Sequence, residues 1–218
     1  MRSAEFEQAK SNVLLLDSVI QDVSLREGSG SYVQFNEITG GLGIAKENNV
    51  MTIKNGTQLV ASYALTDLVF TAGTMTSGAN STLKGTPAIN VSMQQPIGYV
   101  RVETGNGVHI RLDYNRVRVV QLGNQYIGNS NYTFSALTFV RLVQGNISGS
   151  NTGKIMAQNL GVNTTALTYT NLKTNLNITA QLYPSGPATT LLSLLGSTSK
   201  PGNYTVLLSI VTVQISKA

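Results

Sequence analysis

The sequence predicts a mainly β protein: a β-sandwich, as one large unit or two small ones, with one N-terminal amphipathic α-helix. Two patterns predict this fold. Apolar residues recur at steps of three and four over the first 25 residues, and after residue 31 the period changes to two. Charged residues make up only 11% of the 218-residue chain, against about 25% in an average soluble domain. Ser, Thr, Asn, Gln and Gly supply the polar surface instead, which indicates short strands joined by polar turns.

Residues 4–25 are predicted to form the helix. A single apolar stripe runs along it and consists of Phe6, Ala9, Val13, Leu16, Ile20 and Val23. Charged and amide residues, Asp17 among them, are expected on the other faces, and Gly28 and Gly30 end the pattern. The stripe is expected either to dock on the protein's own domain or to supply assembly contacts in a bundle of several chains, as the end of a longer helix.

Residues 31–218 are expected to form one β-rich domain, with a subdivision near 74–96 as the alternative. Strands are predicted at 32–35, 42–46, 50–54, 59–65, 68–72, 99–103, 108–114, 134–143, 166–169, 177–183 and 204–215. The dipeptide Asn55-Gly56 is a strong hairpin signal, and 188–195 fits a short helix or a strand. The last segment is apolar at even positions first and at odd positions later. This indicates a strand that is buried on both faces or bulged near Ser209.

Charge is unevenly distributed along the chain. All ten Asp and Glu residues lie at or before Asp113, and seven Lys and Arg residues follow it. Because these seven are scattered rather than clustered, we expect no nucleic-acid partner. The sequence has no cysteine, which excludes disulfides, thiolate catalysis and cysteine metal ligands.

No segment of the sequence is expected to cross a membrane. There is no run of 18 apolar residues, and residues 1–3 lead straight into the predicted helix without a cleavable leader. For an exported protein, the targeting segment and any membrane-inserted helix are therefore expected upstream of this chain.

Few residues could carry catalysis or bind a metal. The single histidine, His109, alternates with Arg111 and Asp113 on the polar side of a predicted strand, which favours a solvated strand face. No Gly-x-Ser-x-Gly motif is present. The carboxylates of the β region show no paired spacing of the kind a glycosidase needs; they are Glu37, Glu47, Asp67, Glu103 and Asp113. We therefore expect no catalytic residues, no metal site, no cofactor and no enzymatic activity.

N-glycosylation sequons are abundant. Eight begin at Asn55, Asn80, Asn90, Asn131, Asn146, Asn163, Asn177 and Asn203. With 20 Asn and 44 Ser or Thr residues, chance placement gives roughly four. The excess indicates a glycosylated surface protein that is exported from the cell; composition alone is the alternative.

Four short segments resemble the opening of archaeal type IV pilin-like surface proteins. They are FEQAK at 6–10, LLDSVIQDV at 15–23, GSGSYVQF at 28–35 and GGLGI at 40–44. In that group a class III signal peptide and a hydrophobic helix precede such a segment, and a β-rich, often glycosylated domain follows outside the cell. The resemblance covers about residues 4–60, and the rest of the chain resembles nothing specific.

The resemblance implies an extracellular structural or assembly protein at the cell surface, as a pilin-like subunit or accessory of an archaeal filament or envelope. The implied partners are other pilin-like subunits or copies of itself, with surface-layer protein or glycan as a further partner. Two alternatives remain open. One is an adhesin-type binding module, which is expected to show a concave basic or tyrosine-lined site free of sequons; the other is a viral or envelope coat protein. An enzyme would instead bring two carboxylates, or His109 and a carboxylate, together in a pocket.

Overall fold

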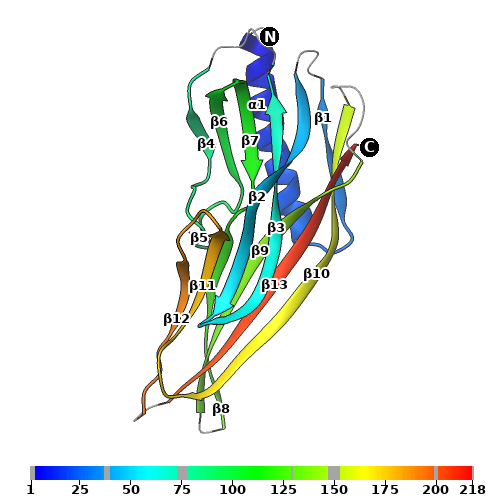
Figure 1. Ribbon diagram of the computed structural model, residues 1–218. Helices are drawn as coiled ribbons and strands as arrows, with labels where there is room; N and C mark the ends of the chain where they lie inside the picture. The colour runs from blue at the N-terminus through cyan, green and yellow to red at the C-terminus, as the bar shows by residue number, and fades with distance from the viewer. Residues whose placement is uncertain are drawn as a thin grey trace.

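A computed structural model describes residues 3–36, 40–72, 78–128, 130–146, 153–198 and 201–217. It confirms the predicted fold class: two sheets form an elongated β-sandwich, and one helix at the N-terminal end of the chain lies at one end of the body (Figure 1). The predicted turn residue Thr39 lies outside the described residues.

The helix α1 spans Ser3–Ser24. The described strands are β1 Gly30–Phe35, β2 Gly41–Asn55, β3 Gln58–Thr71, β4 Ser81–Lys84, β5 Asn90–Val91, β6 Tyr99–Gly105, β7 Gly107–Asp113, β8 Val117–Ile127, β9 Ser130–Gln144, β10 Gly153–Leu172, β11 Leu176–Tyr183, β12 Thr189–Leu194 and β13 Gly202–Lys217. One sheet has the order β1-β10-β13-β9-β8-β5, and the other has the order β12-β11-β2-β3-β7-β6-β4. The pairs β13–β9 and β5–β8 are parallel, and the other neighbours are antiparallel.

The interior consists of two hydrophobic cores. The helix-end core contains the apolar stripe of α1 together with Phe35, Phe70, Ile110, Leu112, Val140, Val211 and Val213. The distal core contains Met51, Ile53, Leu137, Phe139, Ile178, Leu208 and Ile210. Side chains of β2, β3, β9, β10 and β13 pack in or against both cores, so the two cores share these five strands; α1, β1, β6 and β7 contribute only to the helix-end core, and β8, β11 and β12 only to the distal core.

Two central strands exchange their buried face between the cores. In β13, Ile210 lies in the distal core and the next residue, Val211, lies in the helix-end core. In β9, Phe139 lies in the distal core and the next residue, Val140, lies in the helix-end core. Phe139 pairs with Ile210 and Val140 with Val211, in an uninterrupted ladder. Because successive side chains of a strand point to opposite faces, this sheet uses one face in the distal core and the other around the helix.

The last strand therefore buries both faces, but one in each half: Val206, Leu208 and Ile210 first, then Val211, Val213 and Ile215. The alternative of a bulge near Ser209 is not observed. Ser209 pairs regularly with Thr164 on one side and with Thr138 on the other. The change of apolar phase in the sequence reflects a change of packing partner, not an inserted residue.

In the other sheet, β2 and β3 change the face that they bury at a β-bulge. Lys46 and Val50 of β2 pair with Thr66 and Ala64 of β3, so that residues 47–49 lie opposite Leu65 alone. Each pair of predicted segments, 42–46 with 50–54 and 59–65 with 68–72, is consequently one continuous strand. The expected hairpin between them is confirmed, with Gly56 as the first turn residue at φ +57°, the position where type II′ turns carry glycine.

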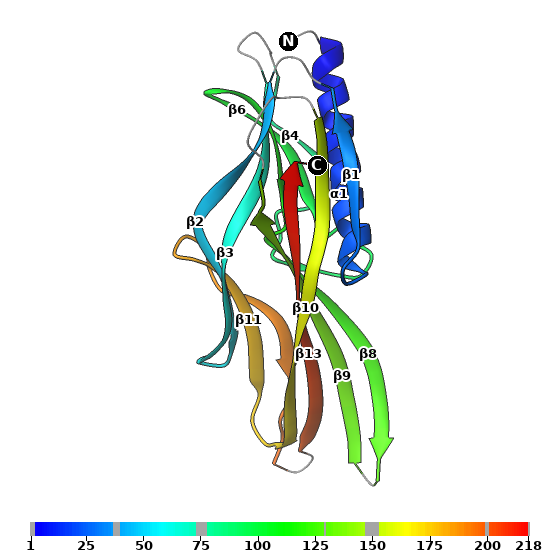
Figure 2. The same cartoon turned by 90° about the vertical axis from the view of Figure 1, so that its right-hand side faces the viewer.

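The helix joins the two sheets. Its six stripe residues are at most 5% exposed, and α1 contacts β1, β10 and β13 of one sheet and β6 and β7 of the other (Figure 2). In Figure 2 it runs beside β1 along the helix-end half of the body. Burial of this stripe explains how a helix with a modest apolar face is stable on a β protein.

A buried carboxylate anchors the middle of α1, which corrects the sequence prediction for Asp17. This residue was expected on a polar outer face, and its side chain is completely buried. Tyr114 donates a hydrogen bond from its hydroxyl to Asp17 Oδ1 at 2.5 Å, and Lys84 Nζ lies 2.5 Å from Oδ2. A Cβ on Gly98 would lie 1.9 Å from Oδ1, so glycine is required where the chain passes this carboxylate.

We expect two neighbouring leucines of α1 to differ sharply on truncation. Leu16→Ala should lower the free energy of unfolding by about 2–5 kcal/mol, because the side chain leaves a cavity in the helix-end core. Leu15→Ala is the matched control, because Leu15 is 53% exposed and should change stability by less than about 0.5 kcal/mol. Urea unfolding of both variants measures this, and equal losses would contradict the docking of α1.

Candidate functional site

A network of ion pairs covers the outer face of β6 and β7. Val108, Ile110 and Leu112 of β7 point into the helix-end core, so Arg111 and Asp113 lie on the opposite face, as the alternation in the sequence predicts. The expectation that this face is solvated is wrong for Asp113, which is only 3% exposed because ion pairs and neighbouring strands cover it. Six side chains of alternating charge follow one another: Asp67, Arg111, Glu103, Arg101, Asp113 and Arg116.

Each inner member of this network has two partners. Arg111 places Nη1 2.8 Å from Asp67 Oδ2 and Nε 3.0 Å from Glu103 Oε2. Glu103 accepts a second bond from Arg101 Nε at 2.6 Å, and Asp113 pairs with both Arg101 and Arg116. Although burial raises the pKa of Glu103, its hydrogen bonds and charge interactions with the two arginines bring it below its ordinary value of 4.5. The network therefore joins β3, β6 and β7 electrostatically.

Asp67 and Glu47 form a carboxyl pair at the edge of this network. Asp67 is completely buried. When its side chain is ionised, its Oδ1 atom has no hydrogen-bond donor within reach. Burial, followed by the hydrogen bond to Glu47, raises the pKa of Asp67 from 3.8 to about 8. A proton on Asp67 resolves the unpaired oxygen, because it can then donate to the Glu47 carboxylate. One proton shared by two carboxyl groups is the arrangement that such a shift indicates.

The carboxylates of the network are buried or paired with arginines, so none of them is free to contact a substrate. Asp67 has no exposed surface, and arginines bind Glu103 and Asp113 from both sides. His109 is half-buried; its Nδ1 lies 3.2 Å from Thr71 Oγ1 and its Nε2 lies 3.3 Å from the carbonyl oxygen of Asn106. Glu37, another carboxylate considered for a pair, lies outside the described residues. Within the described ranges, no three His, Asp or Glu side chains are grouped to bind a metal ion.

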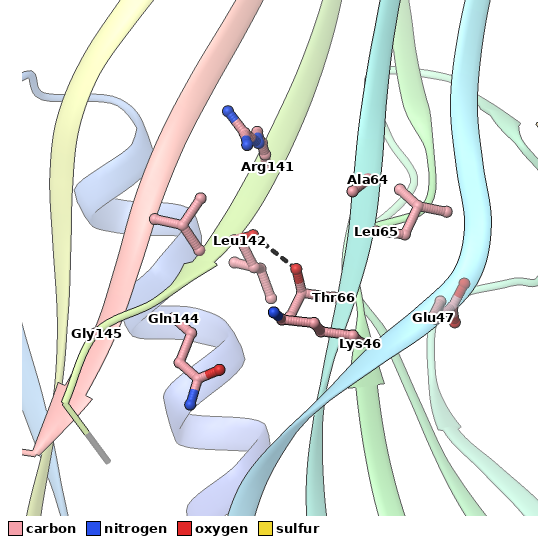
Figure 3. A pocket seen from close by; sticks show the side chains of 10 residues that line it. Lys46, Glu47, Ala64, Leu65, Thr66, Arg141, Leu142, Gln144 and Gly145 are labelled. Atoms are coloured by element: carbon pink, nitrogen blue, oxygen red, sulfur yellow. Dashed lines mark hydrogen bonds between the residues drawn. The ribbon is translucent and has the colours of Figure 1, made fainter.

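A groove of about 540 Å³ lies on the other side of Glu47, between β9 and the β2–β3 hairpin (Figure 3). Its lining residues are Lys46, Glu47, Ala64, Leu65, Thr66, Arg141, Leu142, Val143, Gln144 and Gly145. β8 pairs with β9 only as far as Phe139, so beyond this point β9 approaches β3 instead. Thr66 donates from Oγ1 to the Leu142 carbonyl at 3.0 Å across the groove. The groove thus lies where the buried face of β9 changes.

The sequons differ in accessibility. Five of their asparagines are exposed, namely Asn80, Asn131, Asn146, Asn163 and Asn177, and three are half-buried, namely Asn55, Asn90 and Asn203. The Nδ2 of Asn90 donates to the Thr190 carbonyl at 3.1 Å, and that of Asn203 donates to the Asn131 carbonyl at 3.3 Å. Because a glycan is attached at this nitrogen, the five exposed positions are the more suitable acceptors.

The predicted assembly stripe lies inside the protein. All six residues, Phe6, Ala9, Val13, Leu16, Ile20 and Val23, are buried in the helix-end core of their own chain. Docking on the chain's own domain is therefore what these side chains do. Contacts of the described helix with another subunit have to use its outer face, where Leu15 is exposed.

Sequence reasoning missed the roles of three charged residues: Asp17 at the helix anchor, Asp67 in the ion network and Arg141 in the groove. Asp17 lies four residues after Val13 and three before Ile20, so its place within the stripe was a readable signal. Asp67 and Arg141 were not singled out as partners, because their contacts depend on how distant strands meet. The hairpin of β6 and β7 did offer a signal, since its register places Arg101 opposite Arg111.

A comparison with protein-family models, curated proteins and solved structures finds no match for the chain. Across the described part of the chain, α1 is not apolar enough over a sufficient length to span a bilayer.

The raised pKa of Asp67 predicts a loss of stability with rising pH. Since its folded-state pKa of about 8 exceeds the ordinary 3.8, the folded protein keeps a proton that the unfolded chain releases in this range. The contribution of this proton to the free energy of unfolding is complete below pH 3.8 and is lost as the pH rises toward the folded-state pKa of about 8. Asp67→Asn keeps the shape and can donate to Glu47 without titrating. We therefore expect it to match wild type near pH 4 and to be more stable near pH 9.

Urea unfolding at a series of pH values measures this difference. Asp22→Asn is the control, because Asp22 lies in an exposed ion pair with Arg26 and should leave the pH dependence between about 4 and 8 unchanged. Parallel pH profiles for wild type and Asp67→Asn would refute the shared proton.

Proposed function

We propose that this protein is an extracellular structural protein of the cell surface, a pilin-like subunit or accessory of an archaeal filament or envelope. The observation that carries the proposal is the docking of α1 along the β-sandwich through its own apolar stripe. A β domain carried on an N-terminal helix is the arrangement that the resemblance of residues 4–60 implies. The first turn of α1 lies at one tip of the elongated body (Figure 1), so a longer helix could continue away from the sandwich without disturbing it.

The surface supports the same proposal. It is poor in charge and rich in hydroxyl and amide groups, and five sequon asparagines are exposed on it. These properties suit a glycosylated protein that faces the exterior of a cell. Other pilin-like subunits, copies of itself, or surface-layer protein or glycan are the proposed partners.

The ion network favours a structural role over catalysis. A general acid or base must reach its substrate, and Asp67, whose pKa is the most perturbed of the carboxyl groups that interact here, is completely buried. Asp113 is buried as well, and Glu103, which is partly exposed, is bound by two arginines. The network therefore contributes by fixing the strands that surround the helix.

A binding module is the second candidate, and one observation favours it. The groove beside Glu47 carries Lys46 and Arg141, and no sequon asparagine is among its lining residues, although the exposed Asn146 directly follows the lining residue Gly145. A basic concave site free of sequons is what distinguishes an adhesin-type protein from a purely structural subunit.

The proposal is tested in the native cell. We expect the gene to encode a short basic leader and about 20 apolar residues directly upstream of Ala4, long enough to span a bilayer. Shearing intact cells should release the protein with the surface filaments, and an antibody against the chain should label those filaments. A cytoplasmic enzyme of the same cells is the control for lysis. A conventional cleavable signal together with monomeric protein in the medium would contradict the proposal.

A further inference from the structure

We propose that the groove between β9 and the β2–β3 hairpin binds a small carboxylate ligand, and that Arg141 receives the carboxylate. This site is independent of the proposed structural role, since a filament subunit and a free binding module could both carry it. Three features of the groove support it: the unpaired guanidinium of Arg141, the net charge of the lining and the apolar walls.

Arg141 has unused hydrogen-bonding capacity. Every other arginine of the described residues forms an ion pair or a hydrogen bond; these are Arg26, Arg101, Arg111, Arg116 and Arg118. No described residue accepts a hydrogen bond from the Arg141 guanidinium, and its Nε is buried without a partner. Buried donors without an acceptor are uncommon in folded proteins. A ligand in the groove would supply the missing acceptor.

The guanidinium is already fixed in place. It lies 5.4 Å from the ring centroid of Tyr63, a cation–π contact. The Tyr63 ring in turn stacks on Phe139, with centroids 6.0 Å apart and an interplanar angle of 29°. Arg141 therefore loses little conformational freedom when it binds, and preorganisation of this kind increases affinity.

The charge of the groove favours a monovalent anion. Lys46 and Arg141 are its two cationic side chains and Glu47 its one carboxylate, and no ion pair joins either cation to Glu47 within the described residues. One carboxylate would neutralise the remaining positive charge, whereas a phosphate dianion would leave an excess of negative charge. The planar fork of arginine also matches a carboxylate in bidentate geometry.

The walls of the groove suit an apolar body attached to that carboxylate. Ala64, Leu65, Leu142 and Val143 line it together with the polar residues, and Figure 3 shows Leu142 of β9 facing Thr66 of β3, the strand that also carries Ala64 and Leu65. Its volume of about 540 Å³ is in the range of small-molecule sites. The carboxylate end of a peptide and a sugar acid share this chemistry, so the experiment has to distinguish the two sources.

The test is a titration followed by 15N-correlated NMR spectra of the chain produced without glycans, because the sequon at Asn146 begins directly after Gly145. The probes are N-acetyl-leucine, glucuronate, inorganic phosphate and N-acetyl-leucinamide, which has the same body as the first probe but no carboxylate. We expect saturable shifts of the Arg141 Nε–Hε signal and of the amides of residues 142–145 with a carboxylate and not with the amide. Tighter binding of N-acetyl-leucine indicates a peptide end, and tighter binding of glucuronate indicates a sugar acid.

Two variants separate the site from general effects. Arg141→Gln should weaken carboxylate binding at least tenfold, whereas Arg118→Gln, which removes an arginine outside the groove, should change it less than twofold. If Arg141→Gln fails to fold, as judged by its circular dichroism, Lys46→Gln takes its place with an expected loss of two- to fivefold. Equal binding of acid and amide, binding of phosphate as tight as that of the carboxylates, or no saturable shift with any probe would overturn the assignment. None of these results bears on the filament test.

Discussion

The exchange of buried faces along the central strands is the constraint on which the rest of the structure depends. Ile210 and Val211 are neighbours in β13 and belong to different cores, and their partners Phe139 and Val140 follow the same change. One sheet can therefore pack as a sandwich at the distal end and around a helix at the other end. The helix-end core needs α1, because the apolar faces turned toward it come from both sheets.

Charged and polar side chains lie at the level where β9 and β13 change the face that they bury. The bulge of β2 at residues 47–49 brings Glu47 close to the buried Asp67. Near this bulge, the Arg141 guanidinium packs against the ring of Tyr63. At this junction the regular ladder of β2 and β3 is interrupted, and the buried Asp67 Oδ1 and Arg141 Nε lack hydrogen-bond partners. The structural network on one side of Glu47 and the candidate binding groove on the other have this common origin.

Local patterns predicted much of the fold. The helix was expected at 4–25 and spans Ser3–Ser24, and the strand expected at 108–114 from its alternation is β7, Gly107–Asp113. Only residues 166–169 of β10 were predicted. The helix-end part was missed although Ile155 and Ala157 are buried in alternation, because the third buried position of that period is the polar Asn159, and the residues that follow are mostly exposed. Long-range contacts were not predictable from spacing: the proton shared by Asp67 and the position of Arg141 depend on strands that the sequence does not align. Eight sequons were visible in the sequence, but their accessibility was not.

Native-state hydrogen exchange tests the central claim that the two cores are one cooperative unit built on shared strands. The amides of Leu208 in the distal core and Val213 in the helix-end core lie on one strand with a continuous ladder to β9. We expect both to exchange only through global unfolding, with the same free energy of opening and the same dependence on denaturant. A distal core that opens at a clearly lower free energy than the helix-end core would contradict this account.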